Sequence, residues 1–224
     1  MGQTINLTAE DGFQVSAYHA KPQAAARGGI VVIQEIFGVN HHIRNVADKF
    51  AAEGYEVIAP AIFDRVERNF ETGYAPADIE RGRATRGKLT IDQAVMDIRA
   101  SVKELGKSGQ KVGVVGYCFG GTMAWLAATR IDGVAAAVSY YGGGVADAAE
   151  EKPKAPVMFH FGETDASIPK EHWEKVKTLH PNLPLFVYQD AGHGFHCDER
   201  GSYHEASARE AWGRTIEFFK KHVG

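Results

Sequence analysis

The sequence predicts an α/β fold, in which a mostly parallel β-sheet has helices on both faces and follows an N-terminal hairpin. Short β-branched runs such as Ile30–Ile33 are continuously apolar, as strands buried on both faces require. Segments with helical spacing of apolar residues separate these runs, and this alternation favours parallel strands. Before them, from Ile5 to Ala17, apolar and polar residues alternate on both sides of an Asp11-Gly12 turn, which is typical of a hairpin.

The elements after the hairpin are expected to alternate along the chain. Strands are expected at Ile30–Ile33, Tyr55–Ile58, Lys111–Tyr117, Val134–Tyr140, Val157–Phe161 and Leu185–Tyr188. Helices are expected over residues 43–51, 91–105, 120–129, 169–176 and 202–219. Phe63–Lys88 is expected to be irregular, because Gly73 and Pro76 interrupt any helical period.

Local signals mark the starts of three of these helices. Thr90 with Gln93 and Ser202 with Glu205 match the capping box, in which two side chains satisfy the free backbone N–H groups. Pro169 suits a first helical position, where no N–H is needed.

The composition is that of one domain spanning residues 1–224. Apolar residues make up 44% of the chain, which is ordinary for a packed core. The net charge is −3 with acids and bases interspersed, which argues against a nucleic-acid partner. No apolar run is long enough for a bilayer, the first residues resemble no secretory signal, and two cysteines make no disulfide framework. We therefore expect a cytoplasmic protein without a membrane partner, and the sequence indicates no oligomeric state.

Gly116-Tyr117-Cys118-Phe119-Gly120 is the clearest chemical motif. It follows a predicted strand and opens a predicted helix, as in the G-x-nucleophile-x-G turn, with Cys where Ser is usual. The turn is tight, so the two glycines leave room for neighbouring backbone. The helix N-terminus favours a thiolate and an anionic intermediate at this point. A lone Cys is more often a small buried hydrophobe, but this context indicates a nucleophile.

The partners of a nucleophile follow in the order that this turn requires, an acid and then a histidine. Asp165 follows the strand that ends at Phe161, and His193 lies between two glycines after the last strand. His193 would form an ion pair with the thiol, and Asp165 would orient the imidazole. Glu163 and Asp190 compete with Asp165 for the acid role.

No residue spacing predicts a metal site or a cofactor. The sequence has no HExxH, CxxC or CxxxxH spacing. His41 and His42 precede a helix and are expected only to cap or solvate it. His196 and His204 lie near the predicted site without an evident partner.

Four motifs together resemble the dienelactone hydrolase family, which is carboxymethylenebutenolidase-like and part of the α/β-hydrolase superfamily. They are Gln34-Glu35-Ile36-Phe37-Gly38, Gly116-Tyr117-Cys118-Phe119-Gly120-Gly121, Gly162-Glu163-Thr164-Asp165 and Gly192-His193-Gly194-Phe195. The resemblance runs nearly end to end and implies a single α/β-hydrolase domain with a Cys118, His193 and Asp165 triad. It implies that Glu35 contacts the thiol and activates it when substrate arrives. It also implies an oxyanion hole from the backbone N–H groups of Ile36 and Phe119, which matches the expected geometry of such sites.

The resemblance further implies a carboxylate-bearing substrate held by arginines. One arginine would come from the middle segment, where Arg81, Arg83 and Arg86 are candidates. The other belongs four residues after the catalytic histidine, but that position is Cys197 here, and the nearest arginine is Arg200. This departure leaves the chemistry intact and leaves open whether the ester or lactone substrate is anionic.

Three kinds of function remain open at this stage. The first is hydrolysis of a small ester or lactone without a cofactor, including a general carboxylesterase or a thioesterase. The second is a thiol redox protein that pairs Cys118 with Cys197. The third is a ligand-binding relative of the fold without catalysis, since fold alone does not determine function.

Overall fold

The computed structural model describes residues 2–224 and contains one eight-stranded sheet. The strands are β1 (Gln3–Thr8), β2 (Gln14–Ala20), β3 (Gly29–Ile33), β4 (Glu56–Pro60), β5 (Val112–Tyr117), β6 (Val134–Tyr140), β7 (Val157–Gly162) and β8 (Leu185–Tyr188). Their order across the sheet is β1-β2-β4-β3-β5-β6-β7-β8. The first two strands are antiparallel to their neighbours, and all pairs from β4 to β8 are parallel. The predicted hairpin and mostly parallel sheet are thus confirmed.

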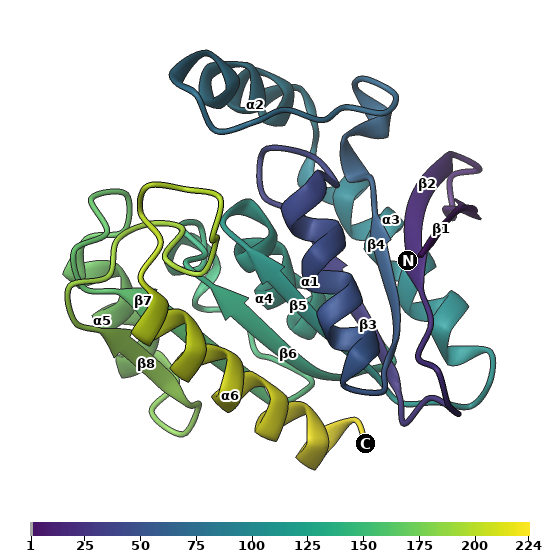
Figure 1. Ribbon diagram of the computed structural model, residues 1–224. Coiled ribbons are helices and arrows are strands. Elements are labelled where there is room, and N and C mark those ends of the chain that lie inside the picture. The colour runs from purple at the N-terminus through teal and green to yellow at the C-terminus, as the bar shows by residue number, and fades with distance from the viewer. Residues whose placement is uncertain (1) are drawn as a thin grey trace.

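Helices cover both faces of this sheet (Figure 1). They are α1 (His41–Ala52), α2 (Pro76–Lys88), α3 (Ile91–Gly106), α4 (Phe119–Arg130), α5 (Lys170–Leu179) and α6 (Glu205–His222), with short 3-10 turns at Ile62–Arg65 and Ala146–Ala148. In Figure 1, α1 and α6 lie in front of the sheet and α3 and α4 lie behind it. Helix α2 lies above the sheet in this view, at the edge where the parallel strands end.

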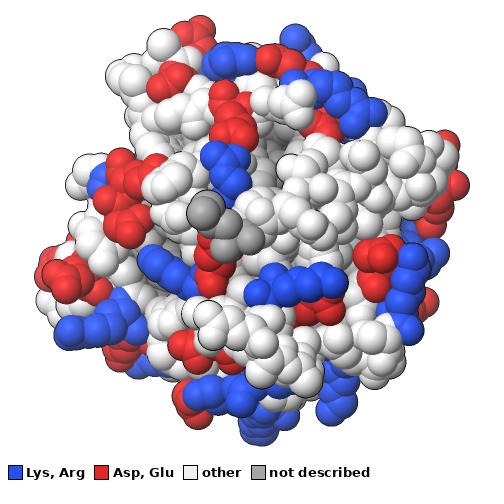
Figure 2. Space-filling view, turned by 45° about the vertical axis from the view of Figure 1, so that its right-hand side comes forward, with Lys and Arg blue, Asp and Glu red and all other residues white. Residues whose placement is uncertain are grey.

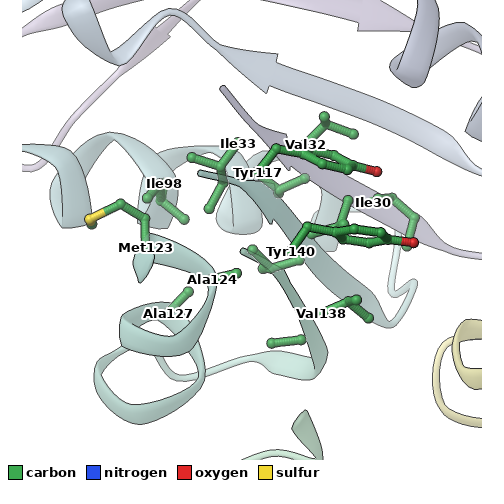
Figure 3. Close-up of a cluster of buried hydrophobic side chains, with 14 of the residues drawn as sticks. Ile30, Val32, Ile33, Ile98, Tyr117, Met123, Ala124, Ala127, Val138 and Tyr140 are labelled. Carbon is green, nitrogen blue, oxygen red and sulfur yellow. The ribbon is translucent and has the colours of Figure 1, made fainter. Parts of the chain in front are cut away.

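The core is formed by the two faces of the central strands. Figure 3 shows Ile33 of β3 meeting Ile98 of α3 and Met123 of α4, whereas Tyr117 and Tyr140 point away from these helices. All five side chains are completely buried. The hydroxyl of Tyr140 bonds to Thr215 of α6 at 2.6 Å, so this face is sealed by α6. The packed core therefore holds the carboxyl ends of β3, β5 and β7 in fixed positions.

Two sequence predictions on helices were wrong and one was inexact. Residues 76–88 form α2 instead of an irregular segment, and Pro76 occupies its first turn, where proline is tolerated. The last helix begins at Glu205 with His204 as its N-cap, so Ser202 and Glu205 form no capping box. Pro169 is an N-cap and not a first helical residue.

The capping box of Thr90 with Gln93 is present, as predicted.

Figure 2 shows basic and acidic side chains interspersed over the face around the N-terminus, without a patch of one sign. None of the helices within residues 2–224 combines the length and apolar character that crossing a bilayer requires.

Candidate active site

Four of the residues singled out in the sequence follow four different parallel strands. Glu35 follows β3, Cys118 follows β5, Asp165 follows β7 and His193 lies in the loop after β8. Because parallel strands end at the same edge of a sheet, these side chains meet at the carboxyl edge. The fold thus gathers residues that are far apart in the sequence.

Cys118 sits on a strained turn between β5 and α4. Its φ of 57° and ψ of −118° lie outside the regions that ordinary residues occupy. A Cβ at Gly116 would lie 1.9 Å from the carbonyl oxygen of Gly120, and a Cβ at Gly120 would lie 2.4 Å from that of Ile33. Only glycine fits at both positions, so the backbone path of the turn is fixed by its neighbours. The Cys118 side chain remains half-buried and faces a pocket.

His193 and Asp165 form a short ionic hydrogen bond beside Cys118. The distance from Nδ1 of His193 to Oδ2 of Asp165 is 2.7 Å, and Oδ1 of Asp165 accepts the backbone N–H of Ser167 at 2.8 Å. Burial lowers the pKa of His193, but the charge of the Cys118 thiolate and the hydrogen bond to Asp165 outweigh it and raise this pKa to about 10. Glu163 and Asp190, the competing acids, are exposed.

Glu35 lies behind this group and is completely buried. Its Oε1 accepts a hydrogen bond from Nη1 of Arg200 at 3.1 Å, while its Oε2 has no partner among the described residues. The Arg200 guanidinium also lies 5.5 Å from the ring centre of Phe37. A Cβ at Gly194 would lie 2.3 Å from Nη1 of Arg200, so this glycine lets the arginine pass close to the histidine loop. Arg200 therefore reaches the site although it stands three positions after Cys197.

A pocket of about 380 Å³ opens over Cys118. Its lining comprises Ile36, Phe37, Ile79, Arg83, Arg86, Cys118, Phe119, Thr122, Gly143, Gly144, Ser167, His193 and Arg200. A larger hollow of about 490 Å³ lies against residues 20–24 and 48–54, but it contains no nucleophile. The volume over Cys118 is that of a small-molecule site.

The arginines of the middle segment divide into two groups. Arg83 and Arg86 line the pocket, whereas Arg81 forms an ion pair with Glu67 and lies over the ring of Phe70. Of the three arginine candidates, Arg83 and Arg86 line this pocket and Arg81 does not. Arg83 and Arg86 stand on α2, so helical geometry turns Arg81 away from the site that they share.

The backbone also offers donors for a negative oxygen. Phe119 is the first residue of α4, so its N–H has no helical carbonyl one turn back to bond with. Ile36 lines the same pocket from the loop after β3. Both positions are those expected for an oxyanion hole.

His42 lies at a place that the sequence does not indicate. Asn40, and not a histidine, caps α1, since its Oδ1 accepts the N–H of Ile43 at 3.2 Å. His42 is buried, and a donor atom of its ring lies within 4.8 Å of donor atoms of Glu35 and Cys197. Among the described residues, these three form a fully buried group whose side chains are of types that bind metal ions. No local signal in the sequence could reveal it, because the loop with Cys197 is distant in the chain.

The sheet order, the strained cysteine turn and the acid and histidine on the last two loops define an α/β-hydrolase. Residues 15–223 match the model of the dienelactone hydrolase family, and the chain belongs to that family. It is thus a hydrolase that acts on ester or lactone bonds.

Known relatives span nearly the whole chain. A protein of Synechocystis sp. named "Putative carboxymethylenebutenolidase" is 34% identical over 236 residues, which cover 97% of this chain and 96% of the relative. A protein of the same name from Escherichia coli K12 is 32% identical and covers 95% and 84% of the two chains. The crystal structure titled "Putative Dienelactone Hydrolase" from Klebsiella pneumoniae has a TM-score of 0.88 at 29% identity, with 99% of each chain covered. The Pyrococcus furiosus esterase Pf2001, at 18% identity and a TM-score of 0.74, shares the fold and covers 100% of this chain and 93% of its own.

Proposed function

We propose that the protein hydrolyses small esters or lactones with Cys118 as nucleophile, His193 as acid and base, and Asp165 as the residue that orients His193. The observation that supports this most is the 2.7 Å bond between His193 and Asp165 beside a cysteine on a strained turn. The raised pKa of His193 favours an imidazolium next to a thiolate, which is the reactive form of such a pair. Residues 1–224 would act as one domain, since every site residue comes from the same sheet.

The reaction would proceed in two steps. The Cys118 thiolate attacks the carbonyl carbon, and the resulting oxyanion accepts hydrogen bonds from the N–H groups of Ile36 and Phe119. His193 gives its proton to the leaving alkoxide, which leaves a thioester on Cys118. Neutral His193 then takes a proton from water, which attacks the thioester and releases the acid and the thiolate. No cofactor or metal is required for these steps.

Glu35 would set the reactivity of Cys118. Its buried carboxylate is held by Arg200, whose guanidinium lies close enough to Cys118 for the two charges to interact. A substrate carboxylate that bonds to Arg200 would compete with Glu35 for the guanidinium. Glu35 would then be free to act on Cys118, in the manner that the family resemblance implies.

The pocket favours a substrate with a carboxylate. Burial lowers the pKa of Arg86, and no carboxylate among the described residues pairs with it. Its guanidinium donates to the carbonyl of Leu89 at 3.0 Å and lies 4.2 Å from the ring centre of Phe119, next to the nucleophile. A partly buried cation without a counter-ion gains from an anionic ligand. We therefore propose a carboxylate-bearing lactone or ester over a neutral one.

A thiol redox function has less support. Burial raises the pKa of Cys197 to about 12, so its thiol stays protonated and is a poor partner for disulfide exchange. A cysteine nucleophile also needs a compartment that keeps it reduced, which supports the cytoplasmic location expected from the sequence.

Hydrolysis of p-nitrophenyl acetate tests the proposal. Wild-type protein should release p-nitrophenol, and prior treatment with iodoacetamide should stop this. The folded variant Cys118→Ala should be inactive, and Cys197→Ala, the matched control for the second thiol, should stay active and sensitive to alkylation. Turnover by Cys118→Ala near that of wild type would refute the cysteine nucleophile.

A further inference from the structure

We propose that Glu35, His42 and Cys197 form a binding site for a soft divalent metal ion of the zinc type, and that the bound ion inhibits the hydrolase. The carboxylate, imidazole and thiolate are the three ligand types that Zn²⁺ takes in proteins. Nothing in the proposed reaction uses His42 or Cys197. The inhibitory part of this inference rests on the role proposed for Glu35.

The three donor atoms already lie together. They fall within 4.8 Å of one another, and each residue is at most 1% exposed. In a tetrahedral zinc site, donor atoms are about 3.3–3.7 Å apart. The present donors must therefore approach one another by no more than about 1.5 Å, which side-chain rotation can supply.

Two buried atoms of the group have no partner in the described chain. They are Oε2 of Glu35 and Nε2 of His42. Buried polar atoms are nearly always bonded to protein, water or a ligand, so two such atoms within one group of donors fit a shared ligand. A single ion between the three side chains would satisfy both, and Oε1 of Glu35 would keep its bond to Arg200.

One ring nitrogen of His42 lies at ion-pair distance from a carboxylate. Nδ1 of His42 lies 3.4 Å from Oδ1 of Asp198. Histidines that bind a metal through one nitrogen usually donate the other N–H to a carboxylate, which fixes the ring. Nε2, the nitrogen without a partner, would then face the ion.

A metal ion bound at this site would immobilise the Glu35 carboxylate. A carboxylate oxygen that coordinates the ion cannot accept a hydrogen from the Cys118 thiol or act as its base. The Cys197 thiol would release its proton to solvent when it binds the ion, so binding would add one net positive charge behind Arg200. Both effects would stop Glu35 from responding to substrate, so the site would make hydrolysis sensitive to metal.

Titration with Co²⁺ tests binding without reference to activity. Wild-type protein should bind one Co²⁺ per chain and show a thiolate-to-cobalt charge-transfer band in the near ultraviolet. The band should persist in Cys118→Ser and be absent in both Cys197→Ser and His42→Gln. Loss of the band in Cys118→Ser with retention in Cys197→Ser would place the metal at the nucleophile and overturn the proposal, as would the absence of any band in wild type.

A matched control separates the buried group from the surface beside it. His42 also lies with Asp198 and Glu199 in a second, partly exposed group of possible donors. Glu199→Gln should therefore bind Co²⁺ as wild type does. If Glu199→Gln abolishes binding and Cys197→Ser does not, the metal belongs to the surface group and the proposal is wrong.

Inhibition is tested with Zn²⁺ in the p-nitrophenyl acetate assay. Cys197→Ser should keep turnover within about twofold of wild type and need at least about tenfold more Zn²⁺ for half-inhibition, since one strong ligand is lost. Equal sensitivity of the two proteins would overturn the inhibitory role. If no protein turns the ester over, the proposed function fails, but the Co²⁺ titration still decides the metal site.

Discussion

Replacing Asp165 by Asn tests the geometry around His193. The two oxygens of Asp165 have different partners, the backbone N–H of Ser167 at 2.8 Å and Nδ1 of His193 at 2.7 Å. An Asn side chain has one oxygen, which the fixed N–H of Ser167 would retain. The amide NH₂ would then face Nδ1 of His193, which must become an acceptor. The proton would move to the other ring nitrogen, so His193 could no longer take a proton from the thiol or from water.

The magnitude follows from the shift in the pKa of His193. A rise from 6.5 to about 10 corresponds to roughly 5 kcal/mol in favour of the imidazolium, shared between the Cys118 charge and Asp165. One charge-assisted hydrogen bond accounts for about 1.5–3 kcal/mol of this. Asp165→Asn should therefore lower kcat/KM by at least about tenfold from the lost hydrogen bond, and by up to about 10⁴-fold with the wrong tautomer.

The pH dependence gives a second readout. In wild type, the group whose pKa is raised stays protonated at neutral pH, so activity that needs the imidazolium should fall as pH rises through about 10. In Asp165→Asn, this alkaline limb should move to lower pH. The assay is kcat/KM for p-nitrophenyl acetate from pH 6 upward, to about pH 10.5, the range that brackets the titration. A loss below threefold with an unmoved limb, or a larger loss in the exposed control Glu163→Gln, would refute the assignment of the acid.

Three further predictions concern the rest of the site. Arg86→Ala should lower kcat/KM for a carboxylate-bearing ester by about ten- to a hundredfold, but not for its methyl ester. Arg81→Ala, the control, should change kcat/KM for neither ester. Equal kinetics of the two esters in wild type would contradict an anionic substrate. Glu35→Gln should lower turnover and move the pH profile of iodoacetamide labelling of Cys118 to lower pH, because a buried negative charge is removed. An unchanged profile and turnover would mean that Glu35 does not influence the thiol. Gly120→Ala should destabilise the fold by about 1–3 kcal/mol or more, because its Cβ would meet backbone at 2.4 Å. Gly87→Ala, with nothing within 4 Å, should not lower the urea midpoint, and equal midpoints in the two variants would refute the steric argument.

The sheet and the turn at Cys118 could be predicted because their determinants are local. A buried parallel strand reads as an apolar run, and the two glycines around Cys118 fix the turn whatever lies elsewhere in the chain. The order of acid and histidine along the chain then follows from the strand order. These signals can be recognised in the sequence without knowledge of tertiary contacts.

Helix α2 could not be predicted for a physical reason. Only Gly82 and Thr85 are buried on it, so no apolar face imposes a period on the sequence. Its two glycines and the proline in its first turn also resemble loop signals. The contact that fixes it is non-local, since a Cβ at Gly82 would lie 2.5 Å from the carbonyl oxygen of Ile36.

The positions of Arg200 and His42 depend on the path of the loop after β8. Counting four residues from His193 leads to Cys197, but the loop brings Arg200 to Glu35 instead. The same loop covers His42 and buries it. Sequence spacing cannot predict such contacts, because loop geometry has no fixed period.

Helix α2 separates two tasks that many enzymes combine. It contributes Arg83 and Arg86 to the pocket but none of the groups that handle electrons or protons, and most of its surface is exposed. If the proposed function holds, mutations at the exposed positions of this helix would change which acyl group is accepted and leave the reacting atoms and the core in place. Within a family that shares one scaffold, residues 76–88 form a compact segment in which new selectivity could evolve, or be selected from a library of variants, while the chemistry stays the same.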